Sequence, residues 1–398
     1  MPVTLQSITF CHNVADPTSS ALRIRRNAAN PIPSPEWTNG GPGGFAGAPA
    51  AYASGLVTAP SVQVGLTGGT PGSELWVRAS GGVLLGNAAA TRVTFDANGS
   101  ARATLALADH GLSGGPVARA DETWTWQTSP DNRTWSWLAT TQHRVYVTLA
   151  LPQAPWMQGA AQGGPPLANE PWAQVLDWAC TWAAGATGVQ QAAQQITQAL
   201  NTNAGVDPAR RVGYERANGK STYAAFGPFQ CTAFLARLNG ANPQLNFVNC
   251  ADCASVVTTF ANILGCALWE SRMTPASSAS GFPLNPVIGI GGDTFGPPFA
   301  SGANAFAYHE VAWAGNAGDW DGVYDACLRV NNTQLGTTRT PDPAHAMPYL
   351  STGEIFTDGI GYRTFRYREQ LVKPATVNGQ QAWDCAACPN TRERRGLM

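Results

Sequence analysis

Alternating hydrophobic and polar positions run through the first 150 residues in short segments. Residues 61–66 (SVQVGL), 75–79 (LWVRA) and 144–149 (RVYVTL) follow this period of two, which is typical of β-strands with one buried face. Pro152 and Pro155 end the last of these segments. Short strands at regular spacing predict two packed antiparallel sheets, that is, a β-sandwich.

A tight turn is predicted within this region. Residues 92–96 and 101–105 both have a strand-like pattern, and Asn98-Gly99 lies between them. This dipeptide favours a two-residue turn because both residues tolerate positive φ. The two segments are therefore expected to pair as a hairpin.

Four tryptophans flank a second predicted hairpin. Trp124 and Trp126 precede the turn at residues 130–132, and Trp135 and Trp137 follow it. With a period of two, each pair falls on one face of its strand, so the four rings could cover one wall of the sandwich. Core packing is the favoured interpretation, and a sugar-binding aromatic platform is the alternative.

The pattern changes to a helical period after a Gly/Pro-rich loop at residues 159–166. Residues 171–182 carry apolar positions at helical spacing, and residues 189–200 predict a second helix rich in Ala and Gln. A third, short helix is predicted after Pro228. This change of pattern places a domain boundary near residue 155.

Composition and charge exclude several classes of function. The 398 residues carry 24 basic and 25 acidic side chains, so no electrostatic surface for nucleic acid or an anionic membrane is expected. The charged run at residues 392–395 is interpreted as a solvated tail. The N-terminus lacks a signal peptide, and the nine cysteines are irregularly spaced. We expect a protein that is cytoplasmic or exported by a signal-peptide-independent route.

A candidate nucleophile lies at the start of another predicted helix. Asn249 suits the N-cap position, and Asp252 three residues later resembles a capping box with Asp in place of Glu. Cys250 then falls in the first helical turn, where free backbone N–H groups and the helix dipole favour a thiolate.

Cys253 is the competing candidate. It shares a helical spacing with Val257, Phe260 and Leu264, which places it on the apolar stripe of this helix. A cysteine in such a stripe behaves as a small hydrophobic residue. Cys250 precedes the stripe at the exposed end, so we favour Cys250.

A histidine and an aspartate follow on two strand-like segments. His309 lies in YHEVAW and Asp325 in VYDAC. A thiol at a helix start, a His on one strand and an Asp on the next can form a Cys-His-Asp site for acyl transfer. Glu310 would point away from His309 and be exposed or salt-bridged.

The order and spacing of these residues match a known pattern. The matching positions are Cys250, Asp252, Ala254, Leu264-Gly265, His309, Trp313 and Asp325. Together they resemble the transglutaminase-like core of the papain-like cysteine enzymes, over about residues 170–330. Two features depart from the family: Gly265 is followed by CALW rather than Ile-Pro-Ala-Arg, and a Gly/Pro-rich insertion at residues 275–302 precedes the His segment.

The resemblance implies a fold and a mechanism. The fold would be an α+β papain-like, transglutaminase-like core in residues 156–398, preceded in residues 1–155 by an immunoglobulin-like β-sandwich with a Pro/Gly-rich N-terminal segment. Cys250 would be the nucleophile, His309 the general base and later acid, and Asp325 the group that orients the imidazole. No cofactor or metal is required.

The expected chemistry is cleavage or exchange of an amide bond in a peptide or protein, through a thioester. Water as the acceptor gives hydrolysis, which we favour, and an amine gives transamidation. The backbone N–H of Cys250 is one expected oxyanion donor, and the side chain of Gln230 is a further candidate. Its alternative is an ordinary polar residue beside Cys231. The β-sandwich would recruit substrate or a protein partner, and the insertion could act as a lid.

Two other interpretations of the protein's function are open. The same fold could serve as a catalytically inactive binding or assembly module. Alternatively, Cys250 and Cys253 could join Cys385 and Cys388 in a tetrathiolate zinc site of a structural protein, because both pairs are Cys-x-x-Cys. The pair Cys385 and Cys388 alone could also form a disulfide or a redox-sensitive clip.

Overall fold

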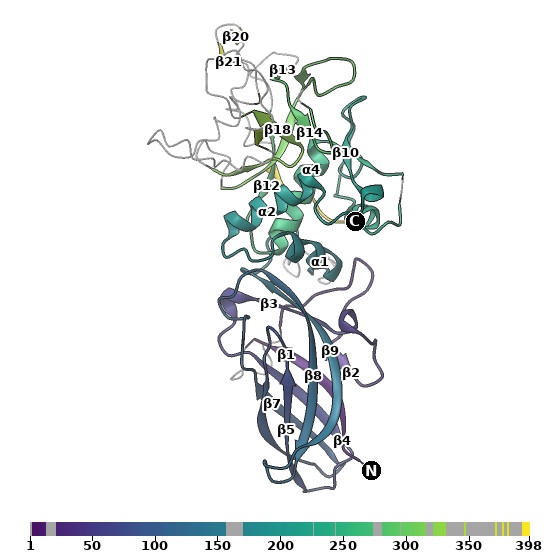
Figure 1. Ribbon diagram of the computed structural model, residues 1–398, viewed down its shortest axis with the longest axis vertical. Helices are drawn as coiled ribbons and strands as arrows, with labels where there is room; N and C mark the ends of the chain where they lie inside the picture. Colours follow the sequence, from purple (N-terminus) through teal and green to yellow (C-terminus); the bar gives the residue numbers. More distant parts are fainter. Residues whose placement is uncertain are drawn as a thin grey trace, which may run out of the picture. The chain divides into compact units, whose positions relative to one another are not determined.

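The computed structural model describes residues 2–12, 21–156, 170–225, 227–242, 244–273, 281–294, 296–315, 321–331, 346–347, 371, 376–377, 380–381 and 392–398. The chain divides into two compact units (Figure 1). Unit 1 holds Met1–Pro152 and Gly159–Gly188, and unit 2 holds Gln153–Gln158 and Val189–Met398. The chain therefore leaves unit 1 close to the expected boundary, but the first predicted helix belongs to unit 1. The protein is β-rich with a few helices, an α+β fold.

Unit 1 is built on two sheets, with strand orders β2-β1-β4-β7 and β3-β9-β8-β5-β6. The helix α1 of this unit packs against β8 and β9. The elements are β1 (Thr4–Cys11), β2 (Trp37–Thr38), β3 (Pro49–Ala53), β4 (Ser61–Thr67), β5 (Glu74–Gly81), β6 (Ala88–Thr94), β7 (Ser100–Ala106), β8 (Ala118–Ser129), β9 (Ser136–Thr148) and α1 (Ala173–Trp182). The predicted alternation is borne out, because β4 buries Val62, Val64 and Leu66 while the residues between them are half-buried.

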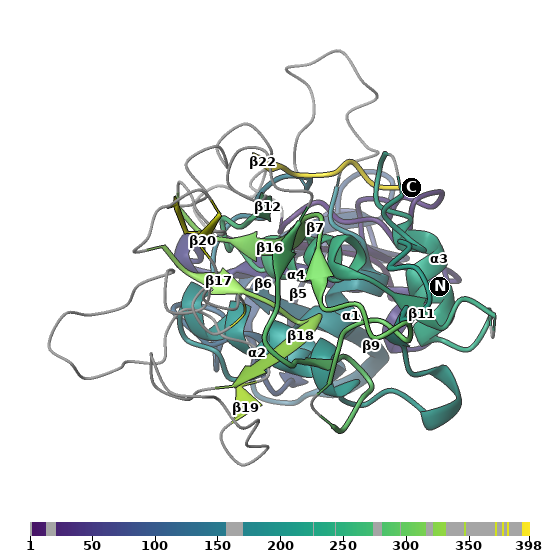
Figure 2. The same ribbon diagram turned by 90° about the horizontal axis from the view of Figure 1, so that it is seen from above.

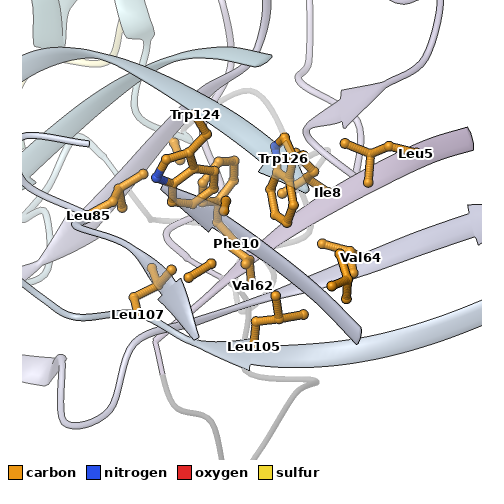
Figure 3. Close-up of a cluster of buried hydrophobic side chains, with 14 of the residues drawn as sticks. Leu5, Ile8, Phe10, Val62, Val64, Leu85, Leu105, Leu107, Trp124 and Trp126 are labelled. Carbon is orange, nitrogen blue, oxygen red and sulfur yellow. The ribbon is translucent and has the colours of Figure 1, made fainter. Parts of the chain in front are cut away.

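The core of unit 1 lies between its two sheets (Figure 3). Trp124 and Trp126 of β8 are fully buried in it and meet edge to face, with ring centroids 5.4 Å apart. Each indole N–H keeps a partner, since Trp124 donates to the Gly86 carbonyl at 2.8 Å and Trp126 to the Thr141 hydroxyl at 2.9 Å. The satisfied N–H groups let two large rings be buried without the cost of an unpaired donor.

The other two tryptophans lie elsewhere, so the predicted single wall of four rings is wrong. The hairpin itself is confirmed, because β8 pairs with β9 along its length. However, Trp137 is 68% exposed, and Trp135 precedes β9 with the guanidinium of Arg78 stacked 3.9 Å from its ring centroid. A bulge after Trp126 shifts the register of the two strands and breaks the alternation on which the prediction relied.

The predicted hairpin around Asn98-Gly99 is also wrong. Here β6 pairs with β5, whereas β7 pairs with β4 in the other sheet. The Asp96 carboxylate accepts hydrogen bonds from the backbone N–H groups of Asn98 and Ser100, at 2.8 and 2.9 Å. The turn is therefore tight as expected, but it carries the chain from one sheet to the other.

Unit 2 packs α4 against a sheet with strand order β17-β16-β12-β22 (Figure 2). Its helices are α2 (Val189–Thr202), α3 (Cys231–Leu238) and α4 (Cys250–Ile263), and a 3-10 turn spans Pro208–Arg210. The strands of this sheet are β12 (Trp269–Met273), β16 (His309–Trp313), β17 (Val323–Tyr324) and β22 (Arg392–Glu393). Shorter strands are β10 (Gly213–Tyr214), β11 (Phe247–Val248), β13 (Phe282–Pro283), β14 (Ile288–Gly289), β15 (Ala305–Phe306), β18 (Leu328–Asn331), β19 (Ala346–Met347), β20 (Thr376–Val377) and β21 (Gln380–Gln381). In the residues described, every helix is too short or too polar to cross a membrane.

Candidate active site

A capping box fixes the start of α4 and with it the position of Cys250. The Asn249 side chain accepts a hydrogen bond from the backbone N–H of Asp252 at 3.1 Å, and the Asp252 carboxylate accepts one from the N–H of Asn249 at 3.0 Å. Both predicted capping contacts are confirmed. Cys250 is therefore the first residue of the helix, in the turn whose N–H groups have no helical acceptors.

Asp252 also organises the loop in front of the helix, a role that sequence reasoning missed. Its carboxylate accepts hydrogen bonds from the Ser221 hydroxyl at 2.5 Å and from the backbone N–H groups of Thr222, Tyr223 and Ala224 at 2.7–2.8 Å. Burial is the main cause that raises the pKa of Asp252, and these donors oppose it. One carboxylate thus joins the helix start to a loop 28–31 residues earlier in the chain.

The helix is buried on every side rather than along one stripe. All residues of α4 are buried, including Cys250, which is 8% exposed, and Cys253, which is 2% exposed. The apolar spacing that favoured Cys250 therefore reflects little difference in solvent contact. What distinguishes the two thiols is their neighbours, because Cys250 interacts with the imidazole of His309, while Cys253 forms a hydrogen bond with Cys327.

His309 and Asp325 are brought together by two antiparallel strands, β16 and β17. The imidazole Nε2 lies 2.9 Å from Oδ2 of Asp325, and both side chains are buried. The other carboxylate oxygen, Oδ1, accepts the backbone N–H groups of Cys327 and Leu328 at 2.7 and 3.2 Å. Phe306 stacks on the imidazole at a centroid distance of 5.3 Å. The imidazole is therefore held in one orientation from two directions.

The charges around His309 favour its protonated form. Burial alone would lower its pKa, but the charge and hydrogen bond of Asp325, with a further contribution from Cys250, raise the pKa of His309 to about 10. Within the described part of the chain, Nδ1 of His309 makes no hydrogen bond of ordinary geometry. With Nε2 held by Asp325, Nδ1 is the ring nitrogen available to the Cys250 thiol.

A cavity of about 580 Å³ opens beside these residues. Asn249 and Ala251, on either side of Cys250, line it together with Tyr308, the neighbour of His309. Its other walls come from the loop that Asp252 holds and from charged side chains of the sheet, including Arg272 and Arg395. Its volume suits a peptide side chain and part of its backbone. A second cavity, of about 310 Å³, is lined by Tyr214 and by residues 289–294 of the Gly/Pro-rich insertion.

The charged run at residues 392–395 is not a solvated tail, which corrects the prediction. Two of its residues form β22, which pairs with β12, and Arg395 is only 8% exposed. Its guanidinium bonds Glu270 at 2.5 Å, Glu310 at 3.2 Å and the Ser255 hydroxyl at 2.9 Å. Glu310 is buried and also pairs with Arg272 at 2.5 Å. Arg395 thus connects β12 to α4 and β16, which carry Cys250 and His309.

The remaining candidates are Gln230 and two cysteines that lie outside the described residues. Gln230 is the N-cap of α3, and its amide nitrogen lies 3.4 Å from the sulfur of Met398. Its role as an oxyanion donor stays a prediction. Cys385 and Cys388 lie outside the described residues, so a zinc site or a clip there stays untested. In the part of the chain that is described, no cluster of three or more His, Cys, Asp or Glu side chains is arranged to hold a metal ion.

Comparison with known proteins gives distant structural likeness only. The sequence matches no family model and no curated protein. Among solved structures, the chain is similar to red sea bream transglutaminase, with a TM-score of 0.37 and 10% sequence identity. The match covers 70% of this chain and 48% of that one, so it spans about half of the transglutaminase's length. A likeness at this level assigns neither an activity nor a catalytic residue.

The capping box yields a stability prediction. Replacing Asn249 with alanine removes the acceptor for the Asp252 N–H and the bond from its amide to the Gly219 carbonyl. We expect a loss of about 1–2 kcal/mol in the free energy of unfolding, measured by urea denaturation. Asn249→Ser keeps a capping acceptor and loses only the Gly219 bond, so it should recover about half of this loss. Equal losses in both variants would show that the cap contributes nothing.

Proposed function

We propose that the protein catalyses cysteine-dependent acyl transfer on amide bonds of peptides or proteins, with Cys250, His309 and Asp325 as its triad. The observation that carries the proposal is the buried 2.9 Å pair of His309 and Asp325, which leaves Nδ1 to the thiol at the start of α4. A buried imidazole whose pKa is raised by a carboxylate partner can hold the proton of a thiol as an ion pair.

Each step of the proposed acyl transfer can be assigned to a named group of the protein. The proton of the Cys250 thiol passes to Nδ1 of His309, and the sulfur attacks the carbonyl carbon of the amide. The oxyanion that forms accepts the backbone N–H of Cys250, which has no acceptor within the helix. His309 next protonates the amine, the C–N bond breaks, and a thioester remains on Cys250. Water or a second amine, deprotonated by His309, then attacks the thioester and releases the thiol.

The arrangement of elements supports the interpretation of unit 2 as a papain-like, transglutaminase-like core. A central helix with the nucleophile at its N-terminus packs on antiparallel strands, with the His at the start of β16 and the Asp directly after β17. This is the arrangement that the transglutaminase-like resemblance implied for unit 2. Hydrolysis remains our preferred reaction. Unit 1 is proposed to bind substrate or a protein partner. Residues 289–294 of the Gly/Pro-rich insertion line the second cavity.

Burial of the triad favours one competing function, a catalytically inactive binding module. His309 is fully buried, and Cys250 is 8% exposed, so little of the proposed nucleophile is open to a substrate carbonyl. An inactive module would contain the same pair of His309 and Asp325 as a structural ion pair. The two functions differ in the reactivity of the thiol.

Iodoacetamide labelling across pH separates them. Peptide mass mapping is carried out on the wild type, Cys250→Ala and His309→Ala between pH 5 and 9. We expect Cys250 to be labelled at pH values well below about 8.5, the usual pKa of a free thiol. The His309→Ala variant should label slowly and only near that pH. Cys253 is the internal control, because it is fully buried and should stay unlabelled in the folded protein. A slow wild-type reaction with the pH profile of His309→Ala would support the binding module.

A further inference from the structure

The candidate nucleophile is the first member of a Cys-x-x-Cys pair on one helical turn. Cys250 and Cys253 occupy the first and fourth positions of α4. Helix geometry places residues three apart about 5 Å from each other between Cα atoms, within the range that a disulfide spans. Both thiols are free in this structure. Cys250, the proposed nucleophile, is 8% exposed, and Cys253 is 2% exposed.

A third thiol supports the inner one. Cys327 follows Asp325 on the loop after β17, and its side chain forms a hydrogen bond with Cys253. This bond lowers the pKa of Cys253 and opposes the larger effect of burial, which raises it. An ionised Cys253 can only accept a hydrogen bond, so Cys327 would be the donor at the moment of attack and would stabilise the Cys253 thiolate. Cys250 and Cys253 thus share one helical turn, and Cys253 in turn contacts Cys327.

We propose that Cys250 and Cys253 form a thiol–disulfide modification site, in which a small disulfide such as oxidised glutathione converts the nucleophile reversibly into an intrachain disulfide. The inference rests on the proposed reactivity of Cys250. It assigns to Cys253 the function of resolving thiol and to Cys327 that of a positioning donor. The modified protein would be inactive in acyl transfer, and a dithiol reductant would restore it.

The chemistry balances in two exchange steps. The Cys250 thiolate attacks one sulfur of oxidised glutathione, which gives a mixed disulfide and releases one glutathione thiolate that takes up the proton of Cys250. Cys253 then attacks the Cys250 sulfur, and its proton leaves with the second glutathione. Two protein thiols are oxidised, one glutathione disulfide is reduced, and two glutathione thiols are released.

The test treats the full chain with oxidised glutathione, quenches with acid, and maps peptides without reduction. In the wild type we expect the peptide with Cys250 and Cys253 to lose two hydrogen atoms, with fragment ions placing the bond between these residues. Cys253→Ser should stop at the mixed disulfide, so glutathione stays on Cys250. Cys327→Ser keeps a donor and should behave as wild type, whereas Cys327→Ala should accumulate the mixed disulfide at least several-fold longer.

The outcomes separate this inference from the proposed function. If Cys250 takes up iodoacetamide at low pH but glutathione remains on it indefinitely in the wild type, the resolving role of Cys253 is wrong and the proposed function stands. A bond between Cys253 and Cys327 instead would also overturn the assignment. If Cys250 reacts with neither reagent, the proposed function itself fails.

Discussion

An Asp325→Asn variant is expected to alkylate at Cys250 about 10²–10³-fold more slowly than the wild type at pH 6, because an unpaired thiol with a pKa of about 8.5 is then ionised to only about 0.3%. The amide keeps an oxygen for the N–H groups of Cys327 and Leu328, but it loses the negative charge beside Nε2. Burial then dominates and lowers the pKa of His309, so the imidazole no longer holds the proton of the thiol.

The pH profile distinguishes this loss from unfolding. In the wild type, the His309 pKa of about 10 predicts alkylation that changes little between pH 6 and 9. In Asp325→Asn, the rate should rise about tenfold for each pH unit up to about 8.5 and approach the wild-type rate there. Asp293→Asn is the matched control, because Asp293 is exposed and lines the second cavity. A flat profile in Asp325→Asn would show that the carboxylate does not control the thiol.

The local signals of the sequence predict the start of the site well. Asn249 and Asp252 cap their own helix over three residues, so their effect depends on nothing distant in the chain. His309 begins β16 and Asp325 directly follows the adjacent strand β17, only 16 residues later. What a short segment determines by itself, such as a capping box or a strand, can be predicted from its residue types.

Contacts between residues far apart in the sequence explain the predictions that were wrong. The turn at Asn98-Gly99 forms, but the sheet that each flanking strand joins depends on partners elsewhere, such as Val62 for Leu105. The periodicity of α4 could not reveal burial on every side, because its serine and two threonines are also buried. The charged run at residues 392–395 indicated exposure to solvent. It could not reveal its buried partner Glu270, because Glu270 precedes Arg395 by 125 residues.

The buried ion pairs of Arg395 give the second large predicted effect. Arg395→Met should lower the free energy of unfolding by about 3–5 kcal/mol at pH 9. The substitution keeps much of the volume of the side chain but leaves the carboxylates of Glu270 and Glu310 without their shared guanidinium. Arg394→Met is the control in the same segment. Arg394 is half-buried over the Trp269 ring, so its loss should cost about 1 kcal/mol or less. Urea denaturation of both variants measures the difference.

The size of the effect should depend on pH in a direction fixed by Glu270. Burial raises the pKa of Glu270 from 4.5 to about 8, and Arg395 opposes this rise. Between these two pH values the folded protein holds the Glu270 proton and the unfolded chain does not. The stability that this proton contributes is therefore fully present below pH 4.5 and is lost as the pH rises to about 8, where the wild-type carboxylate ionises beside Arg395. Without Arg395 the pKa of Glu270 rises further, so Arg395→Met keeps losing stability above pH 8 while the wild type does not. The two stability curves should therefore diverge between pH 8 and 10, and Glu270→Gln in the Arg395→Met background should remove the divergence. Curves that stay parallel would mean that Arg395 stabilises the fold by packing alone.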